Sequence, residues 1–229
     1  MLLPSDAASE QESAFRFSIE TKPIEAIIRI HNELISYGRP FILPANKKLL
    51  LSSSKDNFFI VLVEKGCFSF CHRRTNLHIG TSFAPAIFGL IDGYSYFHNV
   101  KGRPQHYIQA ETLCTGWLVP VDIFLQKSDE LNLWRDIAKI LAQRLMIMCS
   151  RDTELTGNDI YCKIKTLLAE IWTYPEEIRK QITVASFIHH RTRASKSRIL
   201  GILAELKKGD YIQIESGILM SLSKLPEAF

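Results

Sequence analysis

The strongest constraint on the fold is one well-marked helix near the end of the 229-residue chain. Ser195 is a good N-cap for it, because its hydroxyl can accept a backbone N–H that is otherwise unpaired in the first turn. Gly209 tolerates the conformation that ends many helices, and the preceding Lys207 and Lys208 suit the negative end of the helix dipole. One apolar stripe at spacings of three and four lies between these ends, formed by Ile199, Ile202, Leu203 and Leu206.

The segments around this helix complete a small module. An upstream short helix has an apolar face formed by Val184, Phe187 and Ile188. Downstream, two apolar runs flank Glu215-Ser216-Gly217, which predicts a β-hairpin with a glycine turn. A further helix is expected from Asp159 to Trp172, after a break at Thr156-Gly157-Asn158. In this order the elements predict a winged helix-turn-helix over residues 157–229.

Positive charge is concentrated in the same module. Between Thr183 and Lys208, six cations and one carboxylate give a net charge of +5, whereas the whole chain carries +4. Cations beside a helix N-terminus suit DNA phosphates, and short polar or basic side chains in the first turn can reach base edges in a major groove. The expected partner is therefore double-stranded DNA. We expect base-edge contacts from Lys196, Ser197 and Arg198. We expect phosphate contacts from Arg191, Thr192, Arg193 and Ser195, with weaker ones from Lys207 and Lys208.

The Ser195-to-Leu206 helix, followed by Lys207 to Ile212 and a short wing, resembles the C-terminal domain of bacterial transcription regulators of the Crp/Fnr superfamily. Within that superfamily, several strings resemble the IprA group, which is named for inhibiting hydrogen peroxide resistance. These strings are Phe187 to Arg193, Lys207 to Ile212, Lys224 to Glu227, Pro85 to Gly93 and Gly157 to Tyr161. The resemblance implies an α+β fold with an N-terminal cyclic-nucleotide-binding-like β jelly roll, a long dimerisation helix and a C-terminal winged helix-turn-helix. It also implies a homodimeric regulator whose targets touch oxidative stress.

Residues 23–127 have the pattern of a barrel with a leading helix. The helix is expected from Pro23 to Gly38, with His31 on its apolar stripe and therefore packed as a structural histidine. Short β-type segments separated by turn residues follow and indicate a sandwich or jelly roll. These segments are Phe41 to Leu43, Leu49 to Ser52, Phe58 to Val63, Cys67 to Cys71, Leu77 to Ile79, Tyr107 to Ala110 and Thr115 to Val119. Residues 1–22 are polar and acidic, and we expect them to be flexible or weakly helical.

The resemblance also bears on what the barrel binds. Members that bind cyclic nucleotides carry a Gly-Glu pair followed by Arg-Ser or Arg-Thr, in which the acid holds the ribose and the arginine holds the phosphate. The corresponding stretch, Phe83 to Tyr96, has neither that glutamate nor that arginine. We therefore expect no cyclic-nucleotide response. The residues leave open whether the barrel binds another small-molecule effector, and they identify no ligand-binding side chains.

The spacing of candidate ligands supports no other cofactor. The barrel histidines include no His-x-His pair with a glutamate, as a cupin-type metal site requires. An iron–sulfur sensor needs grouped cysteines near the N-terminus, and none precedes Cys67. We expect no metal and no cofactor. The odd number of cysteines favours thiols in a reducing cytosol, with Cys67 and Cys71 buried, and a peroxide-reactive thiol stays an alternative.

Residues 128–153, between the barrel and the DNA-binding module, predict a long helix. Apolar residues recur every seven positions in two series and form a seam of Leu131, Trp134, Ala138, Leu141, Leu145 and Met148. In the resembled superfamily this position holds the dimer helix, and paired half-sites in DNA need a paired reader. We therefore expect a homodimer through this seam. A helix that packs only on its own barrel is the alternative.

These features predict a Crp/Fnr-type DNA-binding transcription regulator that is independent of cyclic AMP. No Ser/His/Asp arrangement or carboxylate pair favours an enzyme. Two alternatives stay open: a module that docks a protein through its winged helix, and a barrel that senses an unidentified ligand or oxidant. The N-terminus lacks the positive region of a signal peptide, and no run approaches the roughly 18 apolar residues of a spanning helix, so we expect a cytoplasmic protein without membrane contact.

Overall fold

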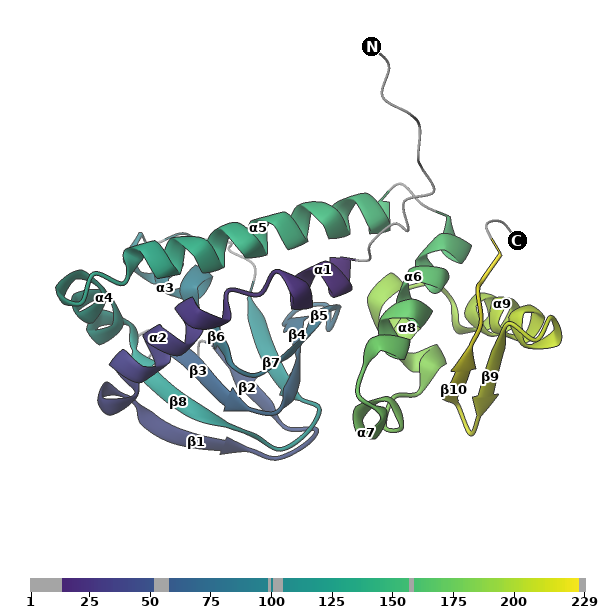
Figure 1. Cartoon of the computed structure of the whole chain (residues 1–229), viewed down its shortest axis with the longest axis horizontal. Coiled ribbons are helices and arrows are strands. Elements are labelled where there is room, and N and C mark those ends of the chain that lie inside the picture. Colours follow the sequence, from purple (N-terminus) through teal and green to yellow (C-terminus); the bar gives the residue numbers. More distant parts are fainter. Residues whose placement is uncertain (1–13, 52–57, 99, 101–104, 157–158, 227–229) are drawn as a thin grey trace, which may run out of the picture. The chain divides into compact units, whose positions relative to one another are not determined.

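The structure is a computed structural model that describes residues 14–51, 58–98, 100, 105–156 and 159–226. It divides into two compact units, one of residues 23–142 and one of residues 1–22 together with 143–229. The long helix α5 (Trp134–Thr156) contributes to both units (Figure 1). The expected flexible stretch 1–13 and the expected helix break at 157–158 lie outside the described residues.

Two four-stranded antiparallel sheets form the β-structure of the 23–142 unit, as the jelly-roll prediction requires. One sheet has the order β1-β8-β3-β6 and the other β2-β7-β4-β5 (Figure 1). The strands are β1 (Arg39–Leu43), β2 (Lys48–Leu50), β3 (Phe59–Lys65), β4 (Cys67–His72), β5 (His78–Phe83), β6 (Ala86–Phe88), β7 (His106–Ala110) and β8 (Cys114–Pro120). Each of the seven expected strands overlaps one of these strands, although Ser52, the expected end of the second, lies outside the described residues. Strand β6 is an addition that pairs Ala86 with Val63 at the sheet edge.

Aromatic and aliphatic side chains fill the space between the two sheets. Phe68 from β4 and Phe88 from β6 meet edge to face, with ring centroids 4.9 Å apart, and Phe70 stacks on Phe88 at 5.5 Å. Val61 and Ile108 are 1 % and 2 % exposed in the same cluster. The interior of the barrel is therefore a packed hydrophobic core in the described residues.

A second core lies between the β1-β8-β3-β6 sheet and the helices that cover it. It joins Ile30 of α2 (Ile24–Leu34) and Ile140 of α5 to Leu62 of β3, each at most 2 % exposed. A 3₁₀ turn (Ile35–Tyr37) extends α2, and α3 (Leu90–Phe97) and α4 (Val121–Glu130) complete this unit. The prediction for His31 is confirmed, because its ring is buried and its Nε2 lies 3.1 Å from the carbonyl oxygen of Ala86.

The long helix begins later than the sequence predicted. The expected span was 128–153, but α4 ends at Glu130 and α5 starts at Trp134. The chain turns between them, with Asn132 in the left-handed region at φ 53°. Arg29 of α2 holds the new helix start through an ion pair of 2.7 Å with the buried carboxylate of Asp136.

The other unit contains the predicted winged helix-turn-helix. Its elements are α1 (Ala14–Glu20), α6 (Ile160–Thr173), α7 (Glu176–Arg179), α8 (Val184–Thr192), α9 (Lys196–Lys208), β9 (Ile212–Glu215) and β10 (Ile218–Leu222). Its buried positions include Ile164, Ile188, Ile199, Leu206 and Leu219, each at most 1 % exposed. Helix α1 falls in the stretch expected to be flexible, and Gln143 of α5 donates a hydrogen bond of 3.1 Å to the Ser18 carbonyl there.

Candidate nucleic-acid interface

The turn between α8 and α9 is fixed by backbone and side-chain hydrogen bonds. Arg193 ends α8 in the left-handed conformation, at φ 59°. The Oγ of Ser195 then accepts the backbone N–H of Arg198 at 3.3 Å, which confirms it as the N-cap of α9. The hydroxyl of Thr192 is already hydrogen-bonded within the turn, because its Oγ1 donates to the Ile188 carbonyl at 2.8 Å and accepts from the Ala194 N–H at 3.2 Å. Its phosphate contact stays a prediction.

Helix α9 separates a buried side from an exposed side. Ile199, Leu203 and Leu206 pack into the unit. The three side chains expected at base edges, Lys196, Ser197 and Arg198, are all exposed in the first turn. Arg198 also lies within electrostatic range of Asp159, the N-cap of α6. The pKa of the Asp159 carboxyl is lowered mainly by a hydrogen bond from the Cys162 backbone, with a smaller contribution from Arg198.

Sequence reasoning did not single out three further exposed residues of this helix: Leu200, Gly201 and Ala204. Leu200 is 55 % exposed although it is apolar. A methyl group added at Gly201 would meet no atom within 4 Å, so that position faces open space. The helical spacing would have found them, because Gly201 and Ala204 lie on the side opposite the stripe of Ile199, Leu203 and Leu206, and Leu200 lies at its flank.

Arg191 does not belong to this surface, and its expected phosphate contact was wrong. Its side chain is 3 % exposed and makes an ion pair of 2.7 Å with Glu170 of α6, whose side chain is 5 % exposed. Its guanidinium also lies over the Phe187 ring at 4.4 Å. The reason is visible in the sequence, because Arg191 follows Val184, Phe187 and Ile188 at the spacing of the buried face of α8.

Glu170 is held on its other side by Tyr174, whose hydroxyl donates a hydrogen bond of 2.6 Å to the second carboxylate oxygen. A buried charge of this kind persists in a protein core only where it is paired and hydrogen-bonded. Arg191, Glu170 and Tyr174 thus tie α8 to α6 behind the exposed surface. Within the described residues, Arg193, Lys196, Arg198, Lys207 and Lys208 are the cations of the charged window that are exposed.

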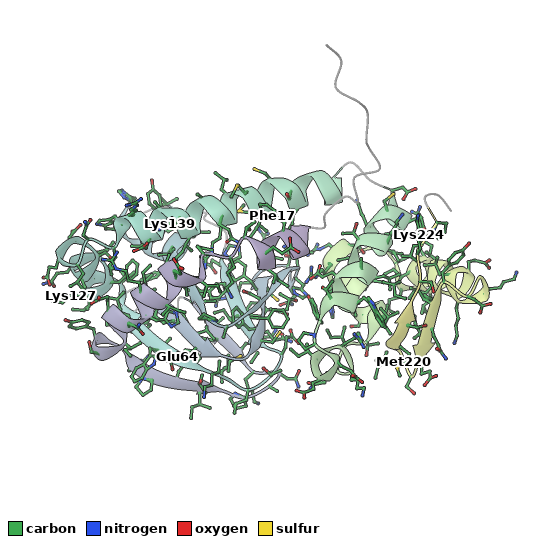
Figure 2. The ribbon with its side chains drawn as sticks, viewed as in Figure 1. Phe17, Glu64, Lys127, Lys139, Met220 and Lys224 are labelled. Atoms are coloured by element: carbon green, nitrogen blue, oxygen red, sulfur yellow. The ribbon has the colours of Figure 1, made fainter. Side chains whose placement is uncertain are left out.

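The hairpin is attached to both helices of the motif. The Val184 N–H at the start of α8 donates to the carbonyl of Gly217, which takes φ 85° in the hairpin turn. Lys207 of α9 donates a hydrogen bond of 3.2 Å to the Ile214 carbonyl on β9. Lys207 therefore connects α9 to the wing and also contributes positive charge to the surface. Figure 2 marks the wing strand β10 with Met220 and the segment that follows it with Lys224.

The seam expected to form the dimer is exposed in the single chain. Leu141, Leu145 and Met148 are 43 %, 62 % and 62 % exposed on α5, and Ala138 is exposed beside them. Trp134 is 41 % exposed at the first residue of α5, and its indole N–H donates to Asp129 at 2.6 Å. Leu131 differs, because it lies in the turn before α5 and packs against the core beneath the helices.

The barrel holds thiols whose pKa values are unfavourable for reaction. Burial raises the pKa of the Cys67 thiol far above its ordinary value, with further contributions from Glu111 and Cys114. Burial and Glu111 raise the pKa of Cys114 to about 11. Among the described residues, no group of three His, Cys, Asp or Glu side chains could hold a metal ion, and no helix is long and apolar enough to cross a membrane.

Residues 160–227 match the family described as "Winged helix-turn-helix DNA binding". The proteins named "Inhibitor of hydrogen peroxide resistance" from Escherichia coli K12 and Salmonella typhimurium are 32 % and 31 % identical to this chain. Each alignment covers 91 % of this chain and 98 % of the relative.

Two solved structures support the fold. A c-di-GMP-responsive global regulator from Xanthomonas campestris superposes with a TM-score of 0.69 at 11 % identity, over 86 % of this chain and 100 % of that one. A transcriptional regulator of the CRP/FNR family from Thermus thermophilus gives a TM-score of 0.61 at 14 % identity, over 79 % and 92 %. This chain therefore has the fold of Crp/Fnr-type DNA-binding regulators.

Proposed function

The chain belongs to the family of the inhibitor of hydrogen peroxide resistance proteins, and from this premise we propose that it regulates transcription as a homodimer on double-stranded DNA. The observation that carries the proposal is the capped N-terminus of α9, where Lys196, Ser197 and Arg198 are exposed beside the positive end of the helix. The family name suggests that the genes it regulates touch oxidative stress and that the protein lowers resistance to hydrogen peroxide. Since DNA is the partner, we assign the protein to the cytoplasm.

The exposed residues of the motif have different roles in this proposal. Lys196, Ser197 and Arg198 contact base edges, because a first helical turn of this kind reaches into the major groove. Arg193 contacts phosphate, together with the N-terminal turn at Ser195. Lys207 and Lys208 make weaker phosphate contacts, since Lys207 is already hydrogen-bonded to the wing.

Dimerisation through α5 is supported by the exposure of its apolar seam. Leu145 and Met148 each leave 62 % of their surface uncovered, which is unfavourable in water unless a second copy covers them. Trp134, Ala138 and Leu141 continue the same seam. Leu131 is excluded from it because it packs on its own unit.

We further propose that the barrel does not respond to cyclic nucleotides and carries no cofactor or active site. The packed interior around Phe68, Phe70 and Phe88 supports this, because a nucleotide would have to displace aromatic side chains already in contact. The absence of the glutamate and arginine of nucleotide-binding relatives supports it as well. The winged helix as a protein-docking surface is the competing function, and a sensor of another ligand or oxidant is a further one.

A salt titration of DNA affinity distinguishes DNA binding from protein docking. We expect log Kd for a random-sequence duplex to rise steeply with log salt concentration between about 50 and about 300 mM. Arg193→Gln should reduce the slope by about 1 per protomer on every sequence, whereas Arg198→Ala should mainly reduce the preference for specific over random DNA. Arg74→Gln, an exposed cation in the turn between β4 and β5, is the control. Weak binding that ignores salt would contradict the proposal.

A further inference from the structure

The outward side of α9 carries small side chains where a DNA-reading helix commonly carries long polar ones. Ser197, Gly201 and Ala204 recur at spacings of four and three and face away from the buried stripe. Apart from Gly201 itself, its two chain neighbours and the backbone of the same helix, no atom lies within 4 Å of the place where a side chain at Gly201 would begin. The backbone of α9 can therefore approach a partner surface closely along this side.

Leu200 borders this outward side and is 55 % exposed. A single exposed leucine needs no explanation by itself. Its position is informative because it lies one turn after Lys196 and one turn before Ala204, so an apolar patch follows directly on a cationic first turn. The exposed cations around it, Arg193, Lys196, Arg198, Lys207 and Lys208, outnumber the one carboxylate of the window, Glu205, and therefore suit a polyanion. In the major groove of such a duplex, the apolar group is the thymine C5 methyl.

Each base presents different groups in the major groove, so the side chains of α9 limit which bases this helix can read. Guanine is read best by a bidentate arginine or lysine, and adenine by a bidentate asparagine or glutamine. Ser197, Gly201 and Ala204 can supply neither of these contacts, since their side chains are too short or lack the groups. The C5 methyl of thymine is instead recognised by apolar contact, for which a leucine and an alanine methyl are suited.

We propose that Leu200 and Ala204 determine specificity by packing against thymine C5 methyl groups in the major groove, with Gly201 allowing the helix to approach closely enough. This proposal rests on the DNA-binding function proposed above. The ligand is a duplex half-site with thymines at the positions that face the middle of α9. Lys196 and Arg198 anchor the helix at its N-terminus, and the apolar patch reads the bases beyond that anchor.

Replacing thymine by deoxyuridine tests the proposal, because it removes the methyl group and leaves base pairing intact. The full-length protein first selects a duplex from a random library, and each thymine of its half-site is then replaced. At one or two positions the affinity should fall by about fourfold per half-site, which corresponds to the loss of one buried methyl contact. Equal affinity for the thymine and uracil duplexes at every position would overturn the proposal.

Protein variants assign the methyl contact to these residues. The Leu200→Ala protein should bind the uracil and thymine duplexes equally at the position that Leu200 contacts. Met220→Ala is the matched control, because Met220 is also an exposed apolar side chain of the module, 41 % exposed, but lies on the wing. It should keep the difference between the two duplexes. A uracil penalty that persists unchanged in both Leu200→Ala and Ala204→Gly would refute the assignment.

Gly201→Leu tests the close approach of α9 to DNA with a variant that is expected to fold. The Cβ of the new side chain meets no neighbouring side chain, and leucine forms helices better than glycine, so the variant should fold at least as stably as the parent. It should lose selective binding while it keeps salt-dependent binding to random DNA. Unchanged selectivity would overturn the close approach. Failure of the parent protein to bind any DNA would refute the proposed function itself, which separates the two failures.

Discussion

Replacing Glu170 by alanine would leave the guanidinium of Arg191 buried without its carboxylate. The two side chains are only 5 % and 3 % exposed, and the ion pair is 2.7 Å long. The hydroxyl of Tyr174 would lose its acceptor in the same step, since it donates to Glu170 at 2.6 Å. Two polar groups in the core between α6 and α8 would therefore lose hydrogen-bond partners.

The size of the effect follows from the burial. Removing one partner of a buried ion pair costs about 3 to 5 kcal/mol, because the remaining charge is neither hydrated nor compensated. For a urea dependence of about 2 kcal/mol per molar, the unfolding midpoint should fall by about 1.5 to 2.5 M. The Glu176–Lys180 pair is the matched control, because it is also short, at 2.6 Å, but its side chains are 64 % and 57 % exposed. Glu176→Ala should therefore cost at most about 0.5 kcal/mol.

Urea unfolding measured on Trp172 fluorescence reports on this unit, because Trp172 lies on α6 two residues from Glu170. The Trp117→Phe/Trp134→Phe background removes the other two tryptophans of the chain. In that background, Glu170→Leu/Arg191→Met should recover most of the stability that Glu170→Ala loses, since the double change removes both buried charges. A midpoint for Glu170→Ala within experimental error of Glu176→Ala would refute the reasoning.

The same double variant decides whether Arg191 contacts DNA. It removes the arginine without leaving an uncompensated charge, so the fold should persist. Its salt slope on random DNA should equal that of the parent protein, because Arg191 is buried and paired within its own unit. A salt slope that is lower by about 1 per protomer in a folded double variant would show that Arg191 contacts phosphate.

Three further outcomes are expected. Leu145→Lys should shift the protein to monomer in sedimentation at micromolar concentration because it places a charge in the seam, whereas Met146→Lys, an exposed apolar position of α5 outside the seam, should not. Desolvation and the neighbouring Arg144 lower the pKa of Lys22 from 10.5 to about 8, so between these two pH values the unfolded chain binds more protons than the folded one. The free energy of unfolding should therefore rise between about pH 8 and pH 10.5 in chemical unfolding, and Lys22→Met should lack this rise. In native thiol labelling at neutral pH, exposed Cys149 should react first, while Cys67 and Cys114 should react only on unfolding, since burial raises their pKa values; fast reaction of Cys67 would favour the thiol-sensor alternative.

Local signals in the sequence were sufficient to predict α9 and its surroundings. The Ser195 cap, the three-four spacing of apolar residues and the closing glycine are all effects of neighbouring residues, and the structure has each of them. The same holds for the hairpin turn at Gly217, where φ is 85°. Short β-type segments between turn residues also identified the seven strands, and helical spacing identified the buried role of His31.

Features that depend on distant packing were missed. Strand β6 has only three residues, and it pairs with β3 because the sheet offers an open edge there. Arg191 was assigned to DNA by its charge, although its helical spacing placed it on the buried face opposite Glu170. Leu131 fitted the heptad seam, but the positive φ of Asn132 starts a new helix after it. The exposed Leu200 was missed because only the buried stripe and the polar first turn of this helix were considered, although the spacing places Leu200 outside that stripe.

The central claim is that a paired winged helix-turn-helix reads a defined DNA sequence. The most direct test is selection of genomic DNA fragments by the purified full-length protein at about 150 mM salt, with Lys196→Ala/Arg198→Ala as the control variant. We predict enrichment of a two-fold symmetric motif with half-sites about one helical turn apart, which the control variant does not enrich. Selection that enriches no motif, or one that the control variant enriches equally, would contradict the account.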